Sequence, residues 1–102
     1  MSVQPAAPDP VDVALRVLLD QPTYAAQTAL TMAAVLDLTP GEPMTYLDCA
    51  RVANLAADAI LGRLPAVVRE ESLARLHPAL PPIGAVTHGE YALHLRNVAK
   101  GL

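Results

Sequence analysis

Residues 45–62 read TYLDCARVANLAADAILG and predict a helix at the centre of the protein. Thr45 supplies the side-chain oxygen of an N-cap, and Asp48 follows three residues later, as in a variant of the capping box. Gly62 stands at the C′ position, where a residue in the left-handed conformation commonly ends a helix. The pattern therefore places a helix that ends at Leu61 in the middle of the hydrophobic core, together with a helix predicted over residues 22–38.

One side of this predicted helix carries only small or aliphatic side chains and is the candidate interaction face. The polar residues fall on a single stripe, and the small residues opposite leave room for another helix to approach closely. The partner helix can belong to the same chain or to another protein. The face consists of Cys49, Val52, Ala53, Ala56 and Ile60.

Four other segments also carry helix signals. Asp9 followed by Pro10 is a favourable helix start, because Asp caps free amides and proline has no amide to satisfy. Thr87 and Glu90 form a full capping box. The expected helices span residues 10–20, 22–38, 66–77 and 87–101, with an extended segment over 64–68 as an alternative and a loop over 77–84.

Composition favours a compact all-α protein. The 102 residues are 53% hydrophobic and 17% charged, and alanine and leucine, both strong helix formers, number 19 and 16. We predict a small single-domain bundle of four to five short helices over residues 10–102, preceded by a flexible N-terminal arm over residues 1–9. A chain of this length buries only about 60% of its unfolded surface, so an oligomer would add stability.

The sequence shows neither a membrane span nor an export signal. A transmembrane helix needs roughly 18 or more apolar residues, whereas the longest uncharged stretch, residues 21–36, contains proline, glutamine and threonine. No basic region precedes an apolar core at the N-terminus, and a single cysteine allows no internal disulfide. We therefore expect a cytoplasmic protein that does not contact a membrane.

Residue types typical of catalysis are present only as isolated groups. Glu90 and His94 lie four residues apart, with His88 nearby, but a metal site needs three or four ligands and Glu90 already serves the capping box. Cys49 shares a stripe with aliphatic residues and is expected to behave as a small buried hydrophobe. The sequence contains no nucleophile elbow and no phosphate-binding glycine loop. We therefore predict no enzyme, no catalytic or metal-binding residue and no cofactor.

The charges are distributed unevenly along the chain. Residues 1–58 hold seven acidic and two basic side chains, whereas residues 59–102 hold three acidic and five basic ones. The five bases form a candidate patch for an acidic partner or a phosphate backbone, although interspersed glutamates also fit an ordinary solvated surface. This basic patch consists of Arg63, Arg69, Arg75, Arg96 and Lys100.

DNA binding is the second hypothesis for function. Residues 22–61 have the outline of a helix-turn-helix, and residues 50–53 (ARVA) and 62–68 (GRLPAVV) resemble stretches of small phage-type excisionases and winged-helix regulators. That resemblance implies duplex binding through a basic helix between the two stretches. Here residues 54–61 carry Asp58 as their only charge, and the chain has a net charge of −3, which opposes phosphate-driven binding.

The first hypothesis is a small non-enzymatic protein-interaction or regulatory accessory protein that acts through an aliphatic helical face. The first three predicted helices have narrow polar stripes, which leaves more apolar surface than a short bundle covers. A homodimer would bury that surface. In the competing arrangement, residues 78–86 fold over the exposed face and complete a monomer, and an alanine- and leucine-lined ligand pocket is the third hypothesis.

Overall fold

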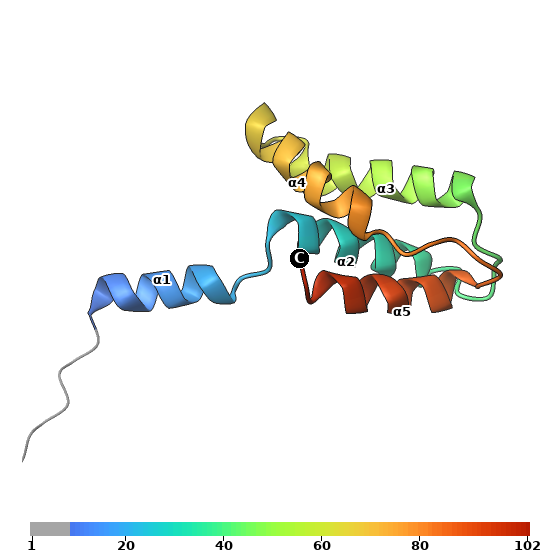
Figure 1. Ribbon diagram of the computed structural model, residues 1–102, viewed down its shortest axis with the longest axis horizontal. Helices are drawn as coiled ribbons and strands as arrows, with labels where there is room; N and C mark the ends of the chain where they lie inside the picture. Colours follow the sequence, from blue (N-terminus) through green and yellow to red (C-terminus); the bar gives the residue numbers. More distant parts are fainter. Residues whose placement is uncertain (1–8) are drawn as a thin grey trace, which may run out of the picture.

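The computed structural model describes residues 9–102, and the side chains of all of these except residues 18–20. The described part is all-α, as predicted, and contains no β-strand, only one isolated bridge between Pro43 and Thr87. The predicted flexible arm lies outside the described residues except for Asp9. The helices are α1 Pro10–Asp20, α2 Tyr24–Leu36, α3 Tyr46–Leu61, α4 Ala66–Ala79 and α5 His88–Ala99 (Figure 1).

The central helix is α2. It packs against α5 on one side and against α3 and α4 on the other (Figure 1). Of the two helices predicted to be central, α2 is the more deeply buried, since α3 buries only Ala56 and Leu61 completely. The reason is charge: α2 has no charged side chain and can be covered on several sides, whereas α3 must keep a polar stripe in water.

Small side chains fill the contact layers of α2. Ala29 and Ala33 are completely buried, and Ala56 of α3 and Ala92 of α5 are completely buried as well. Alanine at these positions allows neighbouring helix axes to approach at the short end of the usual 8–10 Å range. The larger members of the core are Met32, Leu36, Leu76, Tyr91 and Leu95.

The helix starts follow the predicted caps closely. The Thr45 hydroxyl accepts a hydrogen bond from the Asp48 amide at 3.1 Å, and the capping box of Thr87 and Glu90 is complete. α2 begins at Tyr24 and not at residue 22, because Thr23 is its N-cap and accepts from the Ala26 amide at 3.1 Å. α2 also ends at Leu36, two residues before the predicted end.

Besides α2, the ends of α4 and α5 and the conformation of Gly62 differ from the sequence prediction, and α5 ends at Ala99 and not at residue 101. α4 continues through Pro78 to Ala79, because a proline in the last turn removes only one amide from a ladder that is about to end. Gly62 is in the right-handed conformation, with φ −60° and ψ −26°, and not in the predicted left-handed one. Glycine nevertheless fits the space there, since a Cβ would lie 2.5 Å from the Asp58 carbonyl oxygen.

The segment between α4 and α5 folds over the core. Leu80, Ile83 and Val86 pack against it, as the sequence indicated for this loop. The Tyr91 hydroxyl donates a 2.8 Å hydrogen bond to the Pro81 carbonyl, and the Met44 amide donates to the Val86 carbonyl at 2.9 Å. These contacts cover the core with the chain itself, so this part of the bundle is complete without a partner.

α1 lies outside the bundle. Figure 1 shows it projecting from the start of α2, away from the other four helices, and it packs against none of them. The predicted helix over 10–20 is confirmed by α1. The aliphatic residues of α1 are not covered by the bundle. Its exposed aliphatic residues are Val11, Val13, Leu15 and Val17, each 46–63% accessible to solvent.

Candidate functional site

α1 is an amphipathic helix whose local chemistry is complete without the bundle. Asp9 caps it by accepting a 2.9 Å hydrogen bond from the Val11 amide, and Pro10 occupies the first turn. Asp12 and Arg16 are four residues apart and share one side of the helix. Val11 and Leu15 lie on one flank of that side and Val13 and Val17 on the other, so most of the surface formed by residues 10–17 is aliphatic, which is typical of a helix that binds another surface.

The linker from α1 to α2 is short and extended. Gln21 has φ −73° and ψ 139°, which is the region that a following proline favours, and Thr23 has φ −60° and ψ 163°. The Pro22 carbonyl accepts a 2.9 Å hydrogen bond from the Gln27 side chain. The Thr23 hydroxyl donates to the Leu102 carbonyl at 2.9 Å. These contacts fix the direction of the chain between α1 and the start of α2.

A groove of about 510 Å³ lies beside this linker, between α2 and the end of α5. Its floor is apolar, with Ala26 and Leu30 from α2 and Ala99 from α5, and Leu102 closes one end. Leu30 is 39% exposed, although it stands among the buried residues of α2. The complete lining is Gln21, Pro22, Thr23, Ala26, Leu30, Arg96, Ala99, Lys100 and Leu102.

The groove has a basic rim. Arg96 forms an ion pair with Asp37, just beyond the end of α2, which ties α5 to α2. Lys100 is the C-cap residue of α5 and is exposed beside the groove. A basic side chain at a helix C-terminus is also favoured by the helix dipole. The groove can therefore accept an apolar helix that carries acidic residues along its edge.

The predicted interaction face on α3 is used within the chain. Ala56 is completely buried, and Cys49, Val52 and Ala53 are half-buried and pack against the core. Ile60 is half-buried near the end of α3. Cys49, Val52 and Ala53 therefore pack within the same bundle, whereas the aliphatic residues of α1 are exposed.

The predicted basic patch is divided by the fold. Arg69 and Arg75 lie on α4, with Arg63 just before it, whereas Arg96 and Lys100 lie at the end of α5. Figure 1 shows α4 and α5 on opposite sides of α2. Arg75 forms a 3.5 Å ion pair with Glu71, and Arg96 pairs with Asp37. The structure thus forms two small basic areas in which part of the charge is neutralised.

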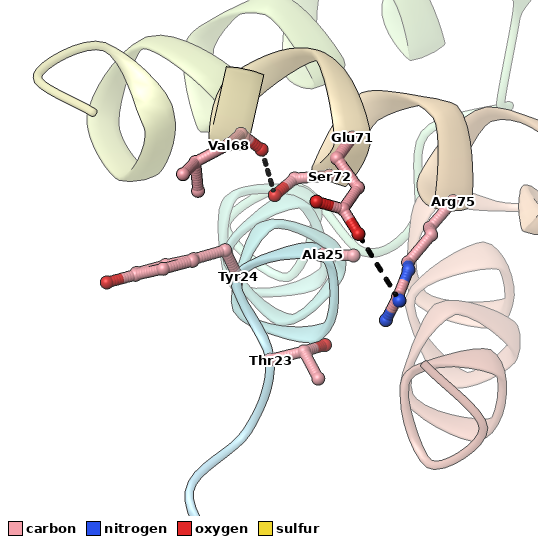
Figure 2. Close-up of a pocket in the computed structure, with 7 residues that line it drawn as sticks. All are labelled: Thr23, Tyr24, Ala25, Val68, Glu71, Ser72 and Arg75. Carbon is pink, nitrogen blue, oxygen red and sulfur yellow. Dashed lines mark hydrogen bonds and ion pairs between the residues drawn. The ribbon is translucent and has the colours of Figure 1, made fainter. Parts of the chain in front are cut away.

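A second hollow, of about 250 Å³, lies between α4 and the start of α2. Figure 2 shows Glu71 and Arg75 reaching from α4 toward Thr23, while the Tyr24 ring points outward. The Ser72 hydroxyl donates to the Val68 carbonyl at 2.7 Å, as a helical serine often does. This hollow is smaller than the α2–α5 groove, and its ion pair is largely exposed to solvent.

A polar cluster connects three elements at the other end of the bundle. His88 Nε2 lies 3.0 Å from Asp48 Oδ2, and His88 Nδ1 lies 2.9 Å from Thr39 Oγ1. Because an ionised carboxylate only accepts, the Nε2 hydrogen is donated to Asp48. The hydrogen bond with His88, followed by that with Thr45, lowers the pKa of Asp48 below its ordinary value of 3.8.

This cluster has the order hydroxyl, imidazole, carboxylate, but its contacts are structural. Both ring nitrogens of His88 are engaged, and the ring is buried against the protein. The His88 amide also donates to the Glu42 carbonyl at 2.8 Å, which holds the 39–44 turn against the start of α5. Neither of the two hollows described above is lined by Thr39, Asp48 or His88.

The other candidate chemical groups are also engaged in the fold. Cys49 Sγ lies 3.7 Å from the Tyr91 hydroxyl, and burial raises the pKa of that tyrosine. Glu90 bonds to Thr87 in the capping box, and His94 points to solvent. Over residues 9–102, no three His, Cys, Asp or Glu side chains come close enough together to hold a metal ion.

The groove and the polar cluster were both missed by sequence reasoning. The groove joins residues 21–30 to residues 96–102, and His88 finds its partners 40 and 49 residues away. Local spacing cannot reveal such pairings. For the groove, one signal was available: Leu30 lies beside Gln27 and Thr31, on the polar side of α2.

Comparison with known proteins identifies no relative. No protein family matches the chain, and neither a curated protein nor a solved structure is significantly similar to it. Among the helices of the described residues, none has both the length and the apolar character needed to cross a bilayer.

Proposed function

We propose that the protein is a small non-enzymatic protein-interaction protein, with a regulatory or accessory role, that binds through the aliphatic side of α1. The observation that carries the proposal is that α1 projects from a bundle whose other helices are packed. Four large aliphatic side chains on three turns of helix remain exposed. Helices of this kind bind by placing their apolar side in a groove.

The charge distribution supports a protein partner over a nucleic acid. The chain carries a net charge of −3, and α1 itself contains more acidic than basic residues. Duplex binding depends mainly on cations placed against phosphates. The basic residues of this chain are divided between two areas, and two of the five are paired with carboxylates.

The stability of α1 gives a direct test of the proposal. Isolated helices of fewer than about 12–15 residues are marginal in water, so α1 amides should exchange with solvent rapidly when no partner is bound. We expect hydrogen exchange in α1 to slow when the protein is concentrated or mixed with its binding partner, while the exchange rates of α2 stay constant. The measurement is hydrogen exchange with mass spectrometry in dilute buffer, in concentrated solution and in lysate of the native host.

The matched variants are both double substitutions on α1. Val11→Gln with Leu15→Gln changes the aliphatic side, and Asp12→Gln with Arg16→Gln changes the polar stripe at the same spacing and leaves the net charge unchanged. Only Val11→Gln with Leu15→Gln should abolish the slowing of hydrogen exchange in α1. Slow exchange of α1 in the dilute monomer, or fast exchange under all three conditions, would contradict an interaction role for this helix.

A further inference from the structure

We propose that the α2–α5 groove binds α1 of a second copy of this chain, so that two chains form a closed dimer by exchanging their first helices. This inference rests on the proposed function, because it names the partner of the aliphatic side of α1. Each chain then supplies one helix and one groove, and a two-fold axis satisfies both at once.

The dimensions of the helix and the groove agree. Between Thr23 and Leu30, the groove follows about two turns of α2, or about 10 Å. α1 has 11 residues and is about 16 Å long, so about two of its three turns can lie along the groove. Leu30 and the side of α1 that carries Val11 and Leu15 are exposed in the single chain, and contact between them would remove these side chains from water together.

The charges of the two surfaces are complementary. Residues 9–20 contain three aspartates and one arginine, which gives the α1 segment an excess of negative charge. The groove is lined by two basic residues, the exposed Lys100 and Arg96, and the charge of Arg96 is shared with Asp37. Opposite charges at the edge of an interface guide association and fix the register of the two helices.

The linker directs α1 away from the groove of its own chain. All three residues between the helices are extended or proline, and none is a glycine that could turn the chain back tightly. Pro22 keeps Gln21 out of the helical region, and Thr23 is held by hydrogen bonds to Leu102 and Ala26. A short, stiff linker of this kind favours exchange between two chains over folding back within one.

A complementation experiment tests the exchange. The helix variant is Val11→Gln with Leu15→Gln, and the groove variant is Leu30→Glu, which places a negative charge against the acidic α1. We expect the wild type to be a dimer in sedimentation at micromolar concentration, and each variant alone to have a dissociation constant raised by at least about tenfold. An equimolar mixture should form a heterodimer, because the intact helix of the groove variant fills the intact groove of the helix variant.

Two controls separate these effects from general damage. Asp12→Gln with Arg16→Gln is the control for the helix variant. Leu93→Glu is the control for the groove variant, since Leu93 is an exposed leucine of α5 outside the groove. Both controls should dimerise like the wild type, and helical circular dichroism should be the same for every variant.

Four outcomes would contradict the exchange of first helices between two chains. Normal dimerisation of Leu30→Glu would mean that α1 pairs with α1, and a monomer with slowly exchanging α1 amides would mean that the helix folds back on its own chain. A monomer whose α1 exchanges rapidly until a different protein is added would refute the second copy as the partner and leave the proposed interaction function intact. Rapid hydrogen exchange of the α1 amides under every condition would refute both the second copy as the partner and the proposed interaction function.

Discussion

α1 and α2 are neighbours in the sequence and are both short, apolar helices, but their surroundings are opposite. α2 has seven buried residues and packs against three other helices, whereas α1 has no extensive packing contact with any of them. Both begin with a side-chain cap and neither depends on the other for its hydrogen bonds. The difference shows that apolar composition predicts that a surface must be covered, but it does not predict which chain provides the cover.

The largest expected difference comes from the same substitution in the two helices. Leu36→Ala removes a side chain that is 1% exposed, and should lower the free energy of unfolding by about 2–5 kcal/mol because a cavity remains. Leu15→Ala removes an exposed side chain, and should change that free energy by no more than about 0.5 kcal/mol in dilute solution. Urea unfolding in dilute solution measures both. Equal losses would show that α1 is packed in the monomer.

The second difference concerns enlargement of a side chain. Ala29 is completely buried between helices, so Ala29→Leu should cost about 1–3 kcal/mol through overpacking. Ala14 on α1 and Ala34 on the exposed side of α2 are matched controls, and leucine at either position should change stability by no more than about 0.5 kcal/mol. If Ala29→Leu were as stable as both controls in thermal unfolding, the assignment of α2 as the central helix would be wrong.

The sequence predicts the fold where interactions are local. The caps at Asp9, Thr45 and Thr87 act within one helical turn, and the helix starts after all three are correct. The end of α4 depends on how a proline fits the last turn, and the position of Gly62 depends on a nearby carbonyl. The amino-acid sequence around Pro78 and Gly62 is compatible with more than one helix ending, so the sequence alone did not predict where α4 ends or which conformation Gly62 adopts.

The arrangement of the helices and the candidate site depend on distant contacts. The small residues Cys49, Val52 and Ala53 of α3 pack against the core, but the sequence does not say which of α2 and α3 is buried more deeply. The sequence indicates an excess of apolar surface over the first three helices, without saying which of them is covered within the chain. Only the path of Gln21, Pro22 and Thr23 shows that α1 is the helix without cover.

A third test concerns the polar cluster of Thr39, Asp48 and His88, which holds the 39–44 turn against the start of α5. α1 plays no part in this cluster. The pKa of Asp48 is lowered, so its carboxylate stabilises the folded state above the ordinary value of 3.8, and this contribution is lost as the pH falls below it. Asp48→Asn should therefore lower the melting temperature at neutral pH, and the gap from the wild type should narrow in acid. Asp58→Asn, on the exposed stripe of the same helix, is the control. A gap that is constant with pH would show that the charge of Asp48 does not matter.

The smallest expected effect comes from the linker, and it links the two helices compared above. Pro22→Ala keeps the backbone carbonyl that Gln27 binds, but it releases Gln21 to adopt helical conformations. The free chain then samples more arrangements, including those in which α1 folds back over its own groove, and dimerisation must compete with them. Losing a favourable proline typically costs about 0.4–1 kcal/mol, so the dissociation constant of the proposed dimer should rise about two- to fivefold.

Pro82→Ala, the same change at an exposed site in the loop before α5, should leave this dissociation constant unaltered. Sedimentation equilibrium measures both variants. If Pro22→Ala tightened association instead, the extended linker would be opposing the exchange, and the stiffness of these three residues would no longer explain why α1 stands apart from α2.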